Sequence, residues 1–214
     1  MNQGEVMRVL PKPFDGATLV EAVTTSLTAF DERGRKFESA ESRAEAGALE
    51  TCLHSDLLAL AVQPIVHAKN HSIFAYEALL RSRHEELNTP LKVLAAAERS
   101  GRISELSDAI AVLSDGWLER IGPEALLFLN LHPQILAEPE RVRAYLNRFG
   151  QGASRIVMEI TERADLRHVP RAEESLSAIR STGARIAVDD VGAGASTLSL
   201  LADVQPEFIK IDMS

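Results

Sequence analysis

Residues 186–194, Ile-Ala-Val-Asp-Asp-Val-Gly-Ala-Gly, are the most informative stretch of this chain. A short apolar run ends at two adjacent carboxylates, Asp189 and Asp190, and a glycine-rich turn follows. This pattern is typical of a buried strand with an acidic site at its carboxyl end. Two carboxylates in a mostly dry place repel each other, and a divalent metal would offset that repulsion. A helix N-cap followed by a turn explains the same residues, so both interpretations stay open at this point.

Short apolar runs alternate with amphipathic stretches from about Leu49 onward, which is the rhythm of a βα repeat. The strand-like runs are 60–66, 73–81, 126–131, 155–160, 185–190 and 208–212. Helices are expected over 91–100, 104–120, 133–149 and 169–182. The alternation predicts an α/β fold of the barrel type, in which the carboxyl ends of parallel strands converge on one face.

Oxygen-bearing side chains interrupt or end four of these runs. They are Glu77, Asn130, Glu159 and the pair Asp189–Asp190. A cap or a satisfied polar group would account for any one of them, but it accounts poorly for five residues on four successive runs. Oxygen donors converging from several strands are what Mg²⁺ or Mn²⁺ requires. The sequence therefore predicts a metal site at the carboxyl ends of the strands.

Composition limits the partners of the protein. The 214 residues carry a formal net charge of −8, which disfavours duplex DNA or RNA and anionic membrane surfaces as partners. Hydrophobic residues make up 45% of the chain, so a packed core is expected. No apolar run approaches the roughly 20 residues that span a bilayer, and no signal-peptide pattern opens the chain. The single cysteine, Cys52, excludes a disulfide framework, so a cytoplasmic location is expected.

The motifs on these runs resemble those of EAL domains, the cyclic di-GMP phosphodiesterases. Residues 77–81 read Glu-Ala-Leu-Leu-Arg, the motif that names the family. The other matching motifs are Gln63-Pro64, Asn130-Leu131-His132-Pro133, Glu159-Ile160-Thr161-Glu162, Asp189-Asp190-Val191-Gly192-Ala193-Gly194 and Lys210-Ile211-Asp212. Their order and spacing agree with the family over residues 49–214.

The resemblance implies a TIM-type (β/α) barrel and a two-metal hydrolase that converts cyclic di-GMP to linear pGpG. Metals about 4 Å apart would activate water and offset charge on the phosphate. The implied ligands of the first Mg²⁺ or Mn²⁺ are Glu77, Asn130, Glu159 and Asp189, and Asp190 joins Asp189 on the second.

The resemblance also assigns roles beyond the metal ligands. Lys210 would approach the attacking water or the scissile phosphate, and Arg81 would pair with a substrate phosphate. Gln63 would contact the nucleotide, and Glu162 would brace the glycine-rich loop. The implied catalytic residues are therefore Glu77, Asp189, Asp190 and Lys210.

The chain also departs from the family pattern. His132 stands where the family has Ser, Val191 where it has Phe, Ala193 where it has Thr, and Ser82 where it has Trp. The sequence accounts for roughly six of the eight strands of a complete barrel, and a Glu that the family carries on a later strand has no counterpart here. An open barrel exposes strand edges, which makes a homodimer possible. The alternative function is therefore a catalytically impaired EAL module that binds cyclic di-GMP or a protein partner.

The N-terminal residues predict a segment separate from the EAL domain. Residues 10–14, Leu-Pro-Lys-Pro-Phe, followed by an amphipathic stretch, resemble the last strand and helix of a response-regulator receiver domain. A Pro-rich turn that leads into a helix explains the same residues. The expected organisation is thus a receiver remnant over 1–30, a charged linker or exposed helix over 31–48, and the EAL domain over 49–214.

Overall fold

The computed structural model describes residues 20, 23–24, 41–161, 166–192 and 197–212. The chain divides into two compact units, Met1–Gly47 and Ala48–Ser214. In the first unit, residues 41–47 are helical. The predicted receiver remnant lies outside the described residues except at positions 20 and 23–24, so it stays a prediction.

The second unit is built on one six-stranded sheet whose strand order follows the chain. Its strands are β1 (Leu58–Val66), β2 (Ile73–Ser82), β3 (Leu126–Asn130), β4 (Ile156–Thr161), β5 (Arg185–Val191) and β6 (Phe208–Ile211). β1 and β2 form an antiparallel hairpin, and β2 to β6 run parallel. All six predicted runs are therefore confirmed as strands. The hairpin explains why no helical pattern separates the first two, since antiparallel neighbours need no crossover.

Helices connect the parallel strands. They are α2 (Pro90–Arg99), α3 (Ile103–Leu118), α4 (Pro139–Asn147), α5 (Ala172–Ser181) and α6 (Thr197–Val204), with short 3-10 turns η1 (Pro133–Ala137), η2 (Gly150–Arg155) and η3 (Leu166–His168). The helix expected over 133–149 is two elements, because Pro139 has no N–H to continue η1 and instead opens α4. The sequence patterns did not predict α6.

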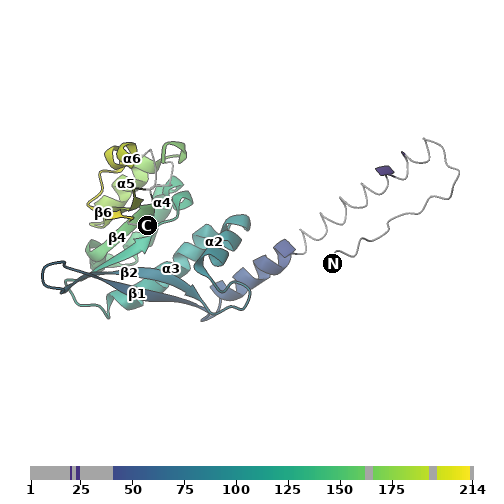
Figure 1. Cartoon of the computed structure of the whole chain (residues 1–214), viewed down its shortest axis with the longest axis horizontal. Helices are drawn as coiled ribbons and strands as arrows, with labels where there is room; N and C mark the ends of the chain where they lie inside the picture. The colour runs from purple at the N-terminus through teal and green to yellow at the C-terminus, as the bar shows by residue number, and fades with distance from the viewer. Residues whose placement is uncertain (1–19, 21–22, 25–40, 162–165, 193–196, 213–214) are drawn as a thin grey trace. The chain divides into compact units, whose positions relative to one another are not determined.

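The sheet has two apolar faces. Its outer face packs against the helices and forms the larger core, with residues such as Leu129, Met158 and Ile186 fully buried. Figure 1 shows α2 and α3 near the β1–β2 hairpin and α5 and α6 near the later strands. The inner face curls enough that Phe208 on β6 meets Phe74 on β2, with ring centroids 5.8 Å apart. The inner face is thus the interior of a barrel-type sheet.

The edges of the described sheet are β1 and β6. The outward side chains of β6 are poorly covered, with Ile209 50% and Ile211 71% exposed. The expected exposed edges are present within the described residues, and the homodimer stays a prediction. A search of the same residues for a helix long and apolar enough to cross a bilayer finds none.

Candidate metal centre

The inner face of the sheet carries two layers of side chains. The first layer is apolar and consists of Ala75, Phe128, Val157 and Ala187, with Phe208 packed against them. Because side chains alternate between the faces of a strand, the residue two positions further on returns to the same face. That step leads to Glu77, Asn130, Glu159, Asp189 and Lys210. Five candidate site residues therefore form the second layer.

Three carboxylates of this second layer meet at one point. Ligand oxygens of Glu77, Glu159 and Asp189 all lie within 4.8 Å of one another. The Lys210 ammonium sits among them, with Nζ 3.0 Å from Glu77 Oε2, 2.7 Å from Glu159 Oε1 and 3.1 Å from Asp189 Oδ2. Three negative charges around one positive charge leave a local excess of negative charge. The sequence prediction that these carboxylates converge agrees with this geometry.

Glu159 is the most constrained member of the cluster. Its side chain has no exposed surface, and neither carboxylate oxygen receives a hydrogen bond of acceptable geometry within the described parts of the chain. Burial raises the pKa of Glu159 to about 7, although the nearby Lys210 ammonium opposes the shift. A buried carboxylate is costly unless something positive compensates it, and Lys210 supplies one positive charge to three carboxylates. The site therefore fits a divalent cation, and its hard oxygen donors suit Mg²⁺ or Mn²⁺.

Lys210 remains protonated in this arrangement. Burial alone lowers the pKa of a lysine, but the contacts with Glu159, Glu77 and Asp189 outweigh it and leave the pKa of Lys210 above its usual value. The side chain is thus a fixed cation among the carboxylates. It is unsuited to accepting a proton near neutral pH.

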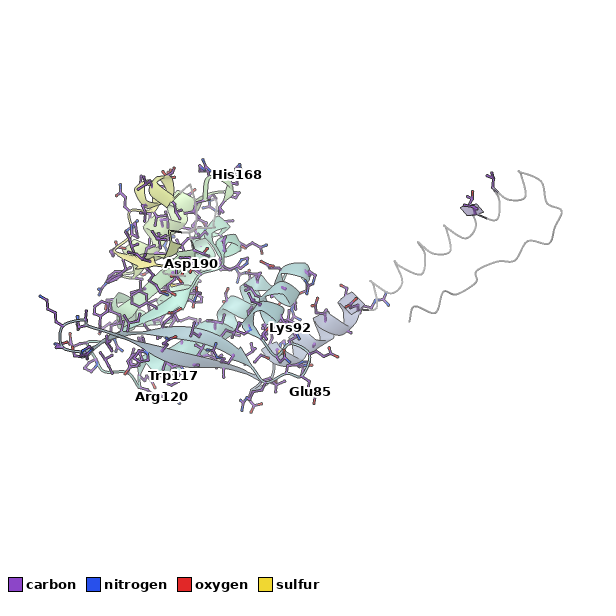
Figure 2. The ribbon with its side chains drawn as sticks, in the orientation of Figure 1. Glu85, Lys92, Trp117, Arg120, His168 and Asp190 are labelled. Atoms are coloured by element: carbon purple, nitrogen blue, oxygen red, sulfur yellow. The ribbon has the colours of Figure 1, made fainter. Side chains whose placement is uncertain are left out.

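A β-bulge lies at the Asp189–Asp190 pair. The pairing of β5 with β6 shifts between Val188 and Val191, so two aspartates stand opposite Lys210 alone. Asp190 has a φ of 60°, and its N–H donates to Asp189 Oδ1 at 2.9 Å. Asp tolerates this left-handed conformation better than most residues, because its short polar side chain bonds locally. Figure 2 labels Asp190 at the end of β5. The three-carboxylate cluster includes Asp189 but not Asp190.

Three of the four remaining predicted site residues lie among the described residues. Gln63 stands directly opposite Glu77 in the β1–β2 hairpin and is exposed. Asn130 pairs with Glu159 in the β3–β4 register. Arg81 is exposed, and its NH1 donates to its neighbour's carbonyl, Leu80 O, at 2.8 Å. Glu162 lies outside the described residues, so its bracing role stays a prediction.

An apolar pocket adjoins the centre. Its volume is about 340 Å³, and Asn130, Arg81 and Thr161 line it together with apolar side chains of α2 and α3 such as Leu94 and Leu106. The sequence patterns missed this pocket, because its walls come from elements distant in the chain. A wider, more open cleft of about 750 Å³ lies along α3 and α4. Acids in that cleft are already paired with Arg102, Arg141 or Arg171, so the carboxylate cluster is the better candidate site.

Comparison with known proteins identifies the class of this fold and site. Residues 46–214 match the family model described as EAL domain. The chain therefore belongs to the EAL domain family and has the α/β barrel-type fold of that family. The match begins at residue 46, and the domain boundary near residue 49 stays a prediction.

Named relatives agree with the family assignment. A probable cyclic di-GMP phosphodiesterase, PdeI of Escherichia coli, is 32% identical over 166 residues, which cover 72% of this chain and 21% of that protein. The structure of the PaMucR phosphodiesterase in complex with c-di-GMP is 29% identical with a TM-score of 0.64, covering 79% of this chain and 72% of that one. A manganese and cyclic di-GMP complex of Klebsiella pneumoniae BlrP1 is 27% identical with a TM-score of 0.65, covering 75% and 42%. The chain spans only 20% to 30% of the length of the curated relatives it matches.

Proposed function

We propose that this EAL domain hydrolyses cyclic di-GMP to linear pGpG with divalent metal ions. One observation carries the proposal: the fully buried carboxylate of Glu159 shares one point with Glu77 and Asp189, and the Lys210 ammonium is the single positive charge in contact with it among the described residues. The named relatives and the metal-bound neighbour support the same chemistry.

Glu77, Asn130, Glu159 and Asp189 would hold the first Mg²⁺ or Mn²⁺, and Asp190 with Asp189 the second. Bound divalent ions supply water of lowered pKa and offset the charge that develops on the phosphate oxygens. Three carboxylates and an amide are hard oxygen donors, which is the ligand chemistry these cations prefer.

The other side chains would bind and orient the substrate. Lys210, which keeps its proton, would act as a cation beside the attacking water or the scissile phosphate. Arg81 would pair with a second phosphate, since a guanidinium offers a planar fork of donors. Gln63 would contact the nucleotide, and the apolar pocket beside Asn130 offers room for a planar base next to the phosphates.

The test is direct. The purified chain is incubated with cyclic di-GMP and Mn²⁺, and pGpG is measured by chromatography. Glu77→Ala should reduce turnover by at least about 10³-fold, since it removes a ligand that stabilises transition-state charge by several kcal/mol. The variant should stay folded, and Glu173→Ala on the exposed face of α5 is the matched control. Retained turnover in Glu77→Ala would refute the assignment.

A second function is favoured by one observation. Within the described residues the carboxylate cluster holds Glu77, Glu159 and Asp189 around a single point, and Asp190 is not part of it. A module that binds cyclic di-GMP or a protein partner without turnover needs no second ion. Binding of cyclic di-GMP by calorimetry, with no pGpG formed, would select this alternative.

A further inference from the structure

His132 joins two elements that border the candidate site. It follows β3 and precedes η1, and its Nδ1 accepts a hydrogen bond from Gln134 N at 3.2 Å. On the other side of the ring, Nε2 lies 2.9 Å from Glu98 Oε1 on α2. Because Nδ1 accepts, Nε2 carries the hydrogen and donates it to Glu98. The imidazole thus caps η1 and reaches α2 at the same time.

The loop that holds His132 is also tied to the centre. Leu131 N donates to the carbonyl oxygen of Glu159 at 2.9 Å, and the preceding Asn130 is aligned with Glu159 in the β3–β4 register. This short segment is therefore held by β4 on one side and by α2 on the other. A shift of the segment toward or away from α2 would move Asn130 relative to Glu159.

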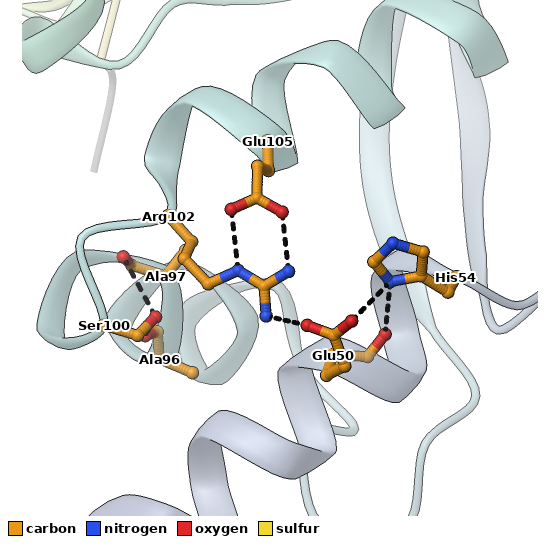
Figure 3. Close-up of polar contacts among 7 residues, drawn as sticks. All are labelled: Glu50, His54, Ala96, Ala97, Ser100, Arg102 and Glu105. Atoms are coloured by element: carbon orange, nitrogen blue, oxygen red, sulfur yellow. Dashed lines mark hydrogen bonds and ion pairs between the residues drawn. The ribbon is translucent and has the colours of Figure 1, made fainter.

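The attachment point on α2 is itself anchored. Ser100 Oγ donates to Ala96 O at the end of α2. Figure 3 shows the two hydrogen bonds from Arg102 to Glu105 in the first turn of α3. The two Arg102–Glu105 hydrogen bonds measure 2.8 and 2.6 Å, and Arg102 also pairs with Glu50. These contacts fix the α2–α3 corner next to Glu98. Glu98 therefore stands one turn before an anchored helix end, and about half of its side chain is exposed.

Both elements that His132 joins contribute walls to the apolar pocket. Pro90, Leu91 and Leu94 come from α2, and Leu131 and Pro133 come from the loop. A serine at position 132 could still accept the hydrogen bond from Gln134 N, but its hydroxyl is too short to reach α2 as well. The tie between loop and helix is therefore specific to the longer imidazole.

We propose that His132 is a positioning residue that clamps the loop after β3 to Glu98 on α2, and so sets both the placement of Asn130 and the width of the apolar pocket. The clamp adds little to global stability, because a single hydrogen bond to a half-exposed carboxylate contributes about 1 kcal/mol. Its effect falls on metal and substrate binding instead. The proposal rests on the proposed function for Asn130 as a metal ligand and for its activity readout.

The test is a double-mutant cycle of His132→Ser, Glu98→Ala and the pair. Mn²⁺ affinity is measured by calorimetry, and kcat and KM are measured for cyclic di-GMP. Each single variant should weaken Mn²⁺ binding and kcat/KM by about tenfold, the lower end for residues that orient a ligand. The double variant should be no worse than either single one, because both changes break the same contact. Melting temperatures should change by only about 2 °C.

Two further variants distinguish a positioning role of His132 from a non-specific disturbance of the fold. Glu98→Gln keeps an oxygen that accepts from Nε2 and should restore Mn²⁺ affinity to within about twofold of the wild type. Glu173→Ala removes an exposed carboxylate from α5, which carries neither His132 nor Glu98, and should change nothing. Additive losses in the cycle, or a Glu98→Gln variant as impaired as Glu98→Ala, would overturn the proposal.

The Mn²⁺ measurement keeps the two proposals distinguishable. If the wild-type chain forms no pGpG, the proposed hydrolysis fails, yet the cycle on Mn²⁺ affinity still tests the clamp. If turnover is normal but the variants bind Mn²⁺ and substrate like the wild type, the clamp is wrong and the hydrolase assignment stands.

Discussion

The two inner layers of this barrel-type sheet use the same strands and the same face for opposite purposes. The apolar layer, exemplified by Phe128 and Ala187, is buried and packed by aromatic contacts such as Phe128–Phe208, with centroids 5.4 Å apart. Two residues further on, the charged layer places Glu159 and Asp189 around Lys210. Burial of the apolar layer stabilises the folded state, whereas desolvation and like-charge repulsion in the charged layer destabilise it.

This difference separates the residues of one strand that stabilise the fold from those that form the candidate site. Glu159 has a raised pKa, and Asp190 has a left-handed backbone. Such features persist only where the surrounding structure enforces them, and they concentrate at functional sites. Substitutions in the apolar layer should therefore change the free energy of unfolding, and substitutions in the charged layer should change metal binding and turnover.

The largest expected effect on stability comes from the apolar layer. Phe128 is 2% exposed and contacts Phe208 inside the sheet. Phe128→Ala should lower the free energy of unfolding by about 3–5 kcal/mol, because it removes buried apolar surface and leaves a cavity. Urea unfolding at pH 8 with chelator present measures the loss. If the free energy of unfolding falls by less than about 1 kcal/mol, packing within this layer contributes little to stability.

The charged layer should make the free energy of unfolding depend on pH, through the buried carboxyl group of Glu159. The pKa of Glu159 is raised to about 7 in the folded state, so the metal-free folded protein binds a proton more tightly than the unfolded chain between about pH 4.5 and 7. The free energy of unfolding should therefore fall as pH rises through this window, by about 3 kcal/mol, and level off above it. Glu159→Gln removes this titration, so the difference between the two unfolding curves isolates it from the histidines. Parallel curves would contradict the prediction.

Removal of the Lys210 ammonium should destabilise the charged layer and leave the apolar layer unchanged. Lys210→Met leaves Glu77, Glu159 and Asp189 facing one another without compensation, and should destabilise the metal-free protein at pH 8 by about 2 kcal/mol. Mn²⁺ should then raise the melting temperature of the variant more than that of the wild type, since no ammonium competes for the carboxylates. Equal shifts in both proteins would show that Lys210 does not occupy the space that the metal needs.

The smallest effect is expected at the bulge. Asp190→Asn keeps a side chain that tolerates the left-handed conformation and removes a negative charge next to Asp189, so it should stabilise the metal-free protein by about 0.5 kcal/mol. Asp203→Asn on the exposed face of α6 is the matched control. A destabilised Asp190→Asn variant would indicate that the Asp190 charge is needed even without metal.

The sequence predicted the strands well and the connections less well. Each of the six runs predicted as strands between residues 60 and 212 is a strand, because short runs of apolar residues suit strands that are buried in a sheet. The patterns did not separate η1 from α4 at Pro139, and they missed α6 because its short apolar stretch has no clear helical period. The antiparallel direction of β1 has a local signal that the patterns left unused, because the link over 67–72 is too short for a parallel crossover.

The sequence by itself predicted which side chains stand together on the inner face of the sheet. Glu77, Asn130, Glu159, Asp189 and Lys210 each stand two residues beyond an apolar residue of the inner face, and their motifs indicated the EAL family. The tertiary structure alone decided how they combine. The bulge at Asp189, the burial that raises the pKa of Glu159, and the contact of His132 with Glu98 all depend on segments distant in the chain. Alternation along a strand is local and can be read from one segment, whereas desolvation and contacts between elements exist only once the whole sheet has closed around them.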